Sequence, residues 1–159
     1  MSDDPFTQTL NRLWELLESH APLADMVRLG NRIKLAGANG DPYKPQVMAA
    51  DLPEVLIEPA GGQVDLFATS TSTRAVQDYA VTAVTGDLRV HTLLFPLKWE
   101  LVKALSRSGD NLGLPFVRKV RIAEQADRAD RGKSARAAGW SLRLIVSVEM
   151  WFASAELQG

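Results

Sequence analysis

The sequence predicts an α+β domain in which two α-helices pack on one face of an antiparallel β-sheet that ends in a long C-terminal strand. Three observations support this fold class. Two segments carry apolar residues at helical spacing, the last part of the chain alternates apolar and polar residues, and 46% of the 159 residues are apolar. We therefore expect a single domain over residues 1–159.

The first helix is expected from about Pro5 to His20. Asp4 is a good N-cap residue, and proline is favoured at the first helical position because its missing amide would have no partner there. Apolar residues then recur at three- and four-residue steps, at Phe6, Leu10, Leu13, Trp14 and Leu17. This stripe predicts an amphipathic helix that ends before Pro22, with His20 favoured near its C-terminus by the helix dipole.

The middle of the chain is expected to hold loops and strands. Between residues 21 and 60, glycines and prolines interrupt short apolar pieces, which predicts long loops and short strands with an exposed loop at about 37–53. Val64 to Thr73 and Arg74 to Thr85 are rich in β-formers and predict two strands. The Ser/Thr cluster at 69–73 indicates a polar edge or a hairpin bend.

A second helix is expected from Leu93 or Pro96 to Ser108, because leucine and alanine again recur at helical spacing. Pro96 fits only in its first turn, and the glycine of Gly109-Asp110-Asn111 is typical of a helix end. Phe116 to Ala123 then alternates imperfectly, which predicts a strand with an irregularity.

The clearest pattern runs from Trp140 to Ser154. One parity holds Trp140, Leu142, Leu144, Val146, Val148, Met150 and Phe152, and the other is mostly polar. A period of two over this length predicts a long antiparallel strand with one buried face. A shift by one residue would expose every one of those apolar groups, so the register should be firmly set.

Composition argues against several classes of function. Eighteen basic and nineteen acidic side chains give a net charge of −1, so no general attraction to nucleic acid or to an anionic membrane is expected. The chain has no cysteine, which excludes disulfides and thiolate nucleophiles. Its acidic N-terminus is unlike a signal peptide, and no apolar run approaches the ~20 residues that span a bilayer. We expect a protein made and used in the cytoplasm.

No motif for catalysis, cofactor binding or metal binding is found. His20 and His91 are far apart in the sequence and have no carboxylate at ligand spacing. Nucleophile elbows, Ser-x-x-Lys boxes and phosphate-binding loops do not occur. Carboxylate pairs at helical spacing, such as Glu15/Glu18 and Asp127/Asp130, are expected to be solvated. We therefore expect no enzymatic activity, no cofactor and no metal.

Two features are candidates for contacts with other macromolecules. Segment 124–138 mixes acidic residues with Arg128, Arg131, Lys133 and Arg136, which predicts an exposed loop that is mobile in the isolated chain. Its basic half could order on a partner or contact a nucleic-acid backbone. Trp151 lies on the more polar parity of the last strand, where it is either an interface anchor or covered by another part of the chain.

Several short sequence segments, and the order in which they occur, resemble those of a known family. After the N-terminal helix come PEVLIEP (Pro53 to Pro59), YAVTAVTGDL (Tyr79 to Leu88), FPLKWELVKAL (Phe95 to Leu105) and the long last strand. Together they resemble the tail terminator and neck proteins of tailed bacteriophages. The resemblance spans nearly the whole chain and rests on pattern and order, because that family has no invariant signature. The Gly/Pro-rich loop at 37–45 departs from its compact members.

The resemblance implies a structural virion protein that forms a ring, usually a hexamer, at the head-proximal end of the tail. Such a ring ends polymerisation of the tail tube and joins the tail to the head connector, so its partners would be further copies, the tail tube protein and connector proteins. Assembly in the host cytoplasm is expected, and the loop at 124–138 could face the tube, the connector or a DNA-carrying lumen. Two alternatives stay open: another neck or head-completion protein, and a small nucleic-acid-binding module that uses the basic residues of 128–136.

Overall fold

The computed structural model describes residues 4–27, 34–35, 54–85, 93–129 and 139–157. In chain order its elements are α1 (Pro5–Glu18), α2 (Ala21–Met26), β1 (Lys34–Leu35), β2 (Glu54–Asp65), β3 (Ser72–Val84), α3 (Phe95–Ser106), the 3-10 turn η4 (Gly109–Asn111), β4 (Val117–Ala129), β5 (Gly139–Ala153) and α4 (Ser154–Leu157).

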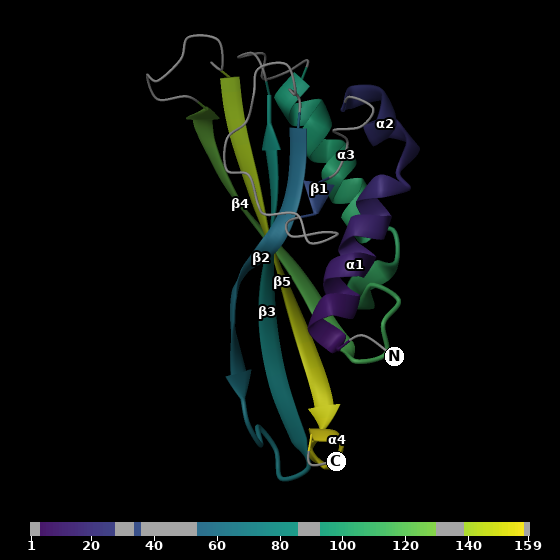
Figure 1. The fold of residues 1–159 in the computed structure, drawn as a ribbon, viewed down its shortest axis with the longest axis vertical. Coiled ribbons are helices and arrows are strands. Elements are labelled where there is room, and N and C mark those ends of the chain that lie inside the picture. Colours follow the sequence, from purple (N-terminus) through teal and green to yellow (C-terminus); the bar gives the residue numbers. More distant parts are fainter. Residues whose placement is uncertain (1–3, 28–33, 36–53, 86–92, 130–138, 158–159) are drawn as a thin grey trace.

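These elements confirm the predicted α+β class. The strands form one sheet in the order β1-β2-β3-β5-β4, in which β2, β3, β5 and β4 pair antiparallel and the short β1 pairs parallel to β2. Helices α1, α2 and α3 lie together on one face of this sheet (Figure 1). In the described part of the chain, no helix has both the length and the apolar character to cross a membrane.

Helix α1 begins as predicted. The Asp4 carboxylate accepts a hydrogen bond from the Thr7 backbone amide at 2.9 Å, and Pro5 occupies the first helical position. Its other end lies close to the predicted one. The helix stops at Glu18, and Pro22 lies in the first turn of α2, where a proline costs no hydrogen bond. His20 is the N-cap residue of α2 rather than the last residue of α1.

Strand β2 is longer and more continuous than the sequence predicted. It runs through Pro59, Gly61 and Gly62, because the register shifts at a bulge between Pro59 and Gly61. Gly61 has a φ of 105°, which a glycine adopts without strain. A Cβ on Gly62 would lie 2.6 Å from the carbonyl oxygen of Val76, so the neighbouring strand also requires a glycine there.

The segment from Val64 to Thr73 is therefore not one strand. It contains the end of β2, a turn over residues 66–71 and the start of β3, so the Ser/Thr cluster lies at a hairpin bend, one of its two predicted places. The Thr69 amide donates to the Ser72 carbonyl at 3.1 Å and closes the turn. The predicted strand from Arg74 to Thr85 is confirmed as β3, and the predicted second helix as α3.

Strand β4 contains the predicted irregularity, a register shift between Val117 and Lys119. It also continues to Ala129, so residues 124–129 are strand and not loop as predicted. This segment has few apolar side chains to hold it in the sheet, but its backbone is paired with β5 up to Ala129, which lies opposite Gly139. Residues 130–138 and the loop predicted at 37–53 lie outside the described residues.

Strand β5 confirms the strongest sequence prediction. Leu142, Leu144, Val146, Val148 and Met150 are buried, and their neighbours on the other face are partly exposed. The buried face meets leucines of the helices, among them Leu13, Leu17, Leu97 and Leu101, in one core. Each fully buried leucine contributes about 1.5–3 kcal/mol, and together these side chains fix the register.

The sheet is longer than the helical layer. The β2–β3 hairpin and the end of β5 extend past the helices to one end of the molecule's long axis, where α4 and the described C-terminus also lie (Figure 1). Helices α2 and α3 lie toward the other end. This arrangement leaves part of the sheet without helical cover.

Candidate functional site

Among the described residues, one ionisable cluster is largely buried by the helices. It joins the start of α2 to α3. His20 Nε2 lies 2.8 Å from Glu100 Oε2, and Lys103 Nζ lies 2.7 Å from Glu100 Oε1. These hydrogen bonds, first that of Lys103 and then that of His20, hold the pKa of Glu100 below its ordinary value. Sequence reasoning missed the pair because its members are 80 residues apart. His91 lies outside the described residues.

This cluster lacks the composition of a metal site. Within the ranges that the structure describes, no three His, Asp or Glu side chains are grouped closely enough to hold a metal ion. Glu100 instead bonds to cationic or hydrogen-bonding groups of the same chain, and Arg107 approaches His20 Nδ1 at 3.4 Å. The contacts fasten α3 to the junction of α1 and α2.

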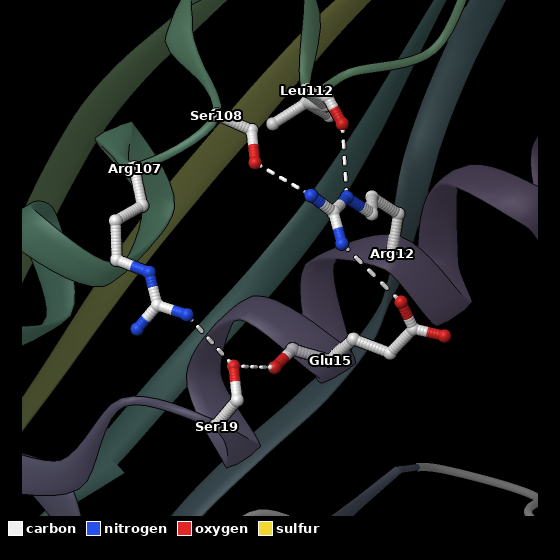
Figure 2. A network of polar contacts seen from close by, with 6 residues as sticks. All are labelled: Arg12, Glu15, Ser19, Arg107, Ser108 and Leu112. Carbon is white, nitrogen blue, oxygen red and sulfur yellow. Dashed lines mark hydrogen bonds and ion pairs between the residues drawn. The ribbon is translucent and has the colours of Figure 1, made fainter.

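A second polar network fastens α1 to the turn that follows α3 (Figure 2). Arg12 donates from Nε to the Leu112 carbonyl at 2.9 Å and from a terminal nitrogen to Ser108 Oγ at 2.6 Å. Arg107 donates to Ser19 Oγ at 3.0 Å, and Ser19 donates to the Glu15 carbonyl at 2.7 Å. Because these groups satisfy one another, we assign the network to the packing of the helices.

Trp151, a predicted interface residue, lies on the sheet face opposite the helices. Its indole Nε1 donates to Glu149 Oε1 at 2.8 Å, and its register partner on β3 is Arg74. Arg74 pairs with Glu149 and with Asp65, at 3.2 Å each. The hydrogen bonds from Arg74 and then Trp151 lower the pKa of Glu149. Trp151 is thus partly exposed and bound to a polar cluster of its own chain.

Of the four basic residues proposed as contacts, the structure describes the backbone of Arg128, which lies far along β5 from Trp151. Arg128 lies in β4 opposite Trp140, at the start of β5, whereas Trp151 lies near the end of β5. Arg131, Lys133 and Arg136 lie outside the described residues. The structure therefore does not bring Trp151 and Arg128 into one site.

Two exposed apolar surfaces emerge instead. The first, here called the hairpin-end surface, consists of Val64, Leu66 and Phe67 at the β2–β3 turn together with Leu157 of α4; these side chains are 54%, 69%, 56% and 54% exposed. The Ser154 amide donates to the Thr71 carbonyl at 2.8 Å and holds α4 against the turn. Sequence reasoning missed this surface because apolar residues at 64–67 resemble a buried strand.

Phe67 is unusual in both side chain and backbone. Its φ of 50° is left-handed, which costs an ordinary residue about 1–2 kcal/mol. Its amide donates to Thr73 Oγ1 at 3.2 Å, a bond that any residue could make. Since more than half of the phenyl group is exposed, burial offsets little of this cost. Glycine or asparagine would suit the turn better, so the fold of the single chain does not explain the phenylalanine.

The second surface, here called the α3–β4 surface, consists of Phe95 and Trp99 on α3 and Ile122 on β4, which are 51%, 60% and 38% exposed. Lysines border it: Lys98 lies 6.0 Å from the Phe95 ring centroid, and Lys103 lies 5.6 Å from that of Trp99. An ion pair between Lys98 and Glu124 joins the helix to the strand. Phe95 and Trp99 are four residues apart, so they lie on the same side of α3, and this spacing can be read from the sequence.

The β2–β3 hairpin and α4 lie at one end of the long axis, and α3 lies toward the other (Figure 1). The two surfaces therefore belong to different parts of the molecule. Large exposed apolar side chains that gather on one part of a protein are typical of protein–protein contacts. Comparison of the chain with protein-family models and with curated proteins found no match. The contacts of the chain itself are therefore the basis for a functional proposal.

Proposed function

We propose that this chain is a structural virion protein of a tailed bacteriophage that assembles into a ring at the head-proximal end of the tail. The observation that supports it is the presence of two different exposed apolar surfaces on one chain. Two different surfaces allow each copy to contact a neighbour on either side, and contacts of this kind produce rings when the rotation closes. A single self-complementary surface would give only a dimer.

The more specific role is supported by the sequence resemblance alone. The sequence segments and their order resemble those of tail terminator and neck proteins, and α1, β2, β3, α3, β4 and β5 are the elements that these parts of the chain form. A ring of this kind, expected to be a hexamer, would end growth of the tail tube and present a surface to the head connector. This role requires contacts between folded proteins and does not require a catalytic residue.

Electron microscopy of the purified chain, alone and with tail tube protein, tests the proposal. We expect closed rings, and tubes that stop growing and carry a ring at one end. Tubes formed without the chain, which should vary in length, provide the baseline. A variant with a charge on an exposed residue of α2, Ala24→Asp, should behave as the native chain does. A chain that stays monomeric in the presence of tube protein would contradict the proposal.

A further inference from the structure

We infer that His20 forms a proton-dependent contact between the junction of α1 with α2 and the C-terminal end of α3. The neutral imidazole accepts a hydrogen bond from Arg107 at Nδ1 and donates one to Glu100 from Nε2, and uptake of a proton at Nδ1 breaks the contact with Arg107. The inference concerns contacts within one chain, so it holds or fails independently of the proposed function.

Both nitrogens of the His20 ring face groups of α3 or its end. The side chain of His20 is 10% exposed and that of Glu100 is 17% exposed. Although His20 is the N-cap residue of α2, its side chain makes no capping bond to that helix. Nε2 lies 2.8 Å from Glu100 Oε2, and Nδ1 lies 3.4 Å from a terminal nitrogen of Arg107. The imidazole therefore connects α2 to α3.

The partners of the ring determine where its proton lies. A guanidinium group has only N–H donors and keeps its charge in proteins, so Nδ1 must present a lone pair to Arg107. The neutral ring then carries its one proton on Nε2, where the carboxylate of Glu100 accepts it. The hydrogen bonds of Lys103 and of His20 hold the pKa of Glu100 below its ordinary value, so this acceptor is ionised at neutral pH. The other tautomer would oppose donor to donor at Arg107 and lone pair to lone pair at Glu100.

A second proton on the ring affects its two contacts in opposite ways. At Nδ1 it replaces the lone pair with an N–H group, so the bond from Arg107 is lost and two cations face each other. At Nε2 it strengthens the bond to Glu100, which becomes a full ion pair. Histidine is the side chain whose ordinary charge change falls between about pH 5 and pH 8. The contact with Arg107 is therefore expected at the upper end of this range and lost at the lower end.

Arg107 is held in place without His20. Its other terminal nitrogen donates to Ser19 Oγ at 3.0 Å, and Ser19 donates in turn to the Glu15 carbonyl (Figure 2). Loss of the bond to His20 thus leaves Arg107 attached to α1. Mild acid should weaken one contact of this junction and strengthen another, and the helices should remain folded.

The charged groups on the helices around His20 also influence its protonation. Besides Glu100 and Arg107 they are Lys103 of α3, Glu15 and Glu18 of α1 and Asp25 of α2. Lys103 is already bonded to Glu100, and the other three are exposed or partly exposed. The carboxylates favour a charged ring and Lys103 opposes it. A test must therefore isolate the contribution of Arg107.

Nitrogen NMR of the imidazole ring tests the assigned proton position. The chain has two histidines, so His91→Gln leaves only the ring signals of His20, and His20→Gln confirms their assignment. At about pH 8 we expect a protonated Nε2 and an unprotonated Nδ1, and at about pH 5 we expect protons on both. A proton on Nδ1 at the higher pH, or a ring that stays neutral at the lower pH, would overturn the inference.

A double-mutant cycle tests the contact itself. His20→Ala, Arg107→Met and the double variant are unfolded in urea at both pH values. We expect the two residues to be coupled by about 5-fold in the unfolding equilibrium constant at about pH 8, the usual net effect of one hydrogen bond, and uncoupled at about pH 5. The matched control is the same cycle with Ser19→Ala in place of His20→Ala, because Ser19 has no charge to gain. Its coupling to Arg107 should be equal at both pH values.

Two outcomes of the cycle would overturn the inference. The first is a coupling of His20 to Arg107 that is absent at the higher pH or unchanged at the lower one. The second is a coupling of Ser19 to Arg107 that falls in parallel, since acid would then loosen the whole junction. If a variant fails to fold, the ring spectrum still decides, because it requires no substitution at the junction.

Discussion

The hydroxyl of Tyr79 on β3 donates a hydrogen bond to the backbone carbonyl of Phe6 in the first turn of α1, at 2.8 Å. Tyr79 is 2% exposed and lies in the centre of the sheet, opposite Val146 of β5. The bond thus fixes the N-terminal end of the helical layer over the sheet. Burial raises the pKa of Tyr79 above its ordinary value, because the phenolate would lose its solvation there.

Tyr79→Phe should lower the free energy of unfolding by about 1 kcal/mol at neutral pH, the usual net value of a hydrogen bond. It should also change the alkaline behaviour. In the native chain the stabilisation is present below pH 10, where the unfolded tyrosine ionises, and is lost as the pH rises further because only the unfolded state releases the proton. Urea unfolding between pH 8 and about 11 should show a smaller decline for the variant. Equal declines would contradict the assigned pKa direction.

Acid should weaken the attachment of α3 through Glu100. Because the hydrogen bonds of Lys103 and His20 lower its pKa from the ordinary value of 4.5, the stabilisation is present above that pH and is lost as the pH falls below it. Glu100→Gln should lower stability at neutral pH and flatten the loss between about pH 5 and pH 3. Urea unfolding of the variant and of an exposed control, Asp25→Asn, measures this. A control that flattens the curve equally would remove Glu100 as the cause.

The elements that could be predicted from the sequence are those in which the spacing of apolar residues shows which side chains are buried. In α1 the spacing of Leu13 and Leu17, and in β5 the alternation from Leu142 to Met150, is the pattern of contact with the core, so both were found with nearly correct bounds. β4 was predicted too short, because its end at Ala129 is fixed by backbone pairing with β5 and leaves little trace in residue type.

The hairpin-end surface could not be predicted from the sequence for a related reason. Residue type alone does not distinguish an exposed phenylalanine in a turn from a buried phenylalanine in a strand. The predicted strand from Val64 to Thr73 therefore included Phe67, which lies between β2 and β3. The parity of Trp151 made it a candidate anchor, and the hydrogen bond from its indole to Glu149, two residues away on the same face, left no trace in the sequence pattern. The contact between His20 and Glu100 depends on the packing of helices far apart in the sequence.

Arg12→Lys should loosen the junction of α1 with the turn after α3. Lysine cannot bond to the Leu112 carbonyl and Ser108 Oγ in the forked geometry of the guanidinium group, so the free energy of unfolding should fall by about 1–2 kcal/mol. Glu15→Gln, which alters only the exposed 3.4 Å ion pair with Arg12, should change it by less than about 0.5 kcal/mol. Chemical unfolding of both variants measures the difference. Equal effects would contradict the assigned role of the forked contact.

Phe67 and Leu112 share a left-handed backbone, with φ of 50° and 57°, but substitution by glycine should have opposite effects. Leu112 is fully buried, so Leu112→Gly should lose about 2–3 kcal/mol: removal of a buried leucine costs about 2–5 kcal/mol, and relief of the backbone returns part of it. Phe67 is largely exposed, so Phe67→Gly should leave stability unchanged or raise it by up to about 1 kcal/mol.

Both changes are best measured in the Trp99→Glu background, where association should not contribute to stability. Thermal and urea unfolding then compare single chains. A loss of more than about 1 kcal/mol for Phe67→Gly would mean that the phenyl group stabilises the isolated fold. Unchanged or increased stability, together with lost association in the native background, would assign the residue to a contact between copies.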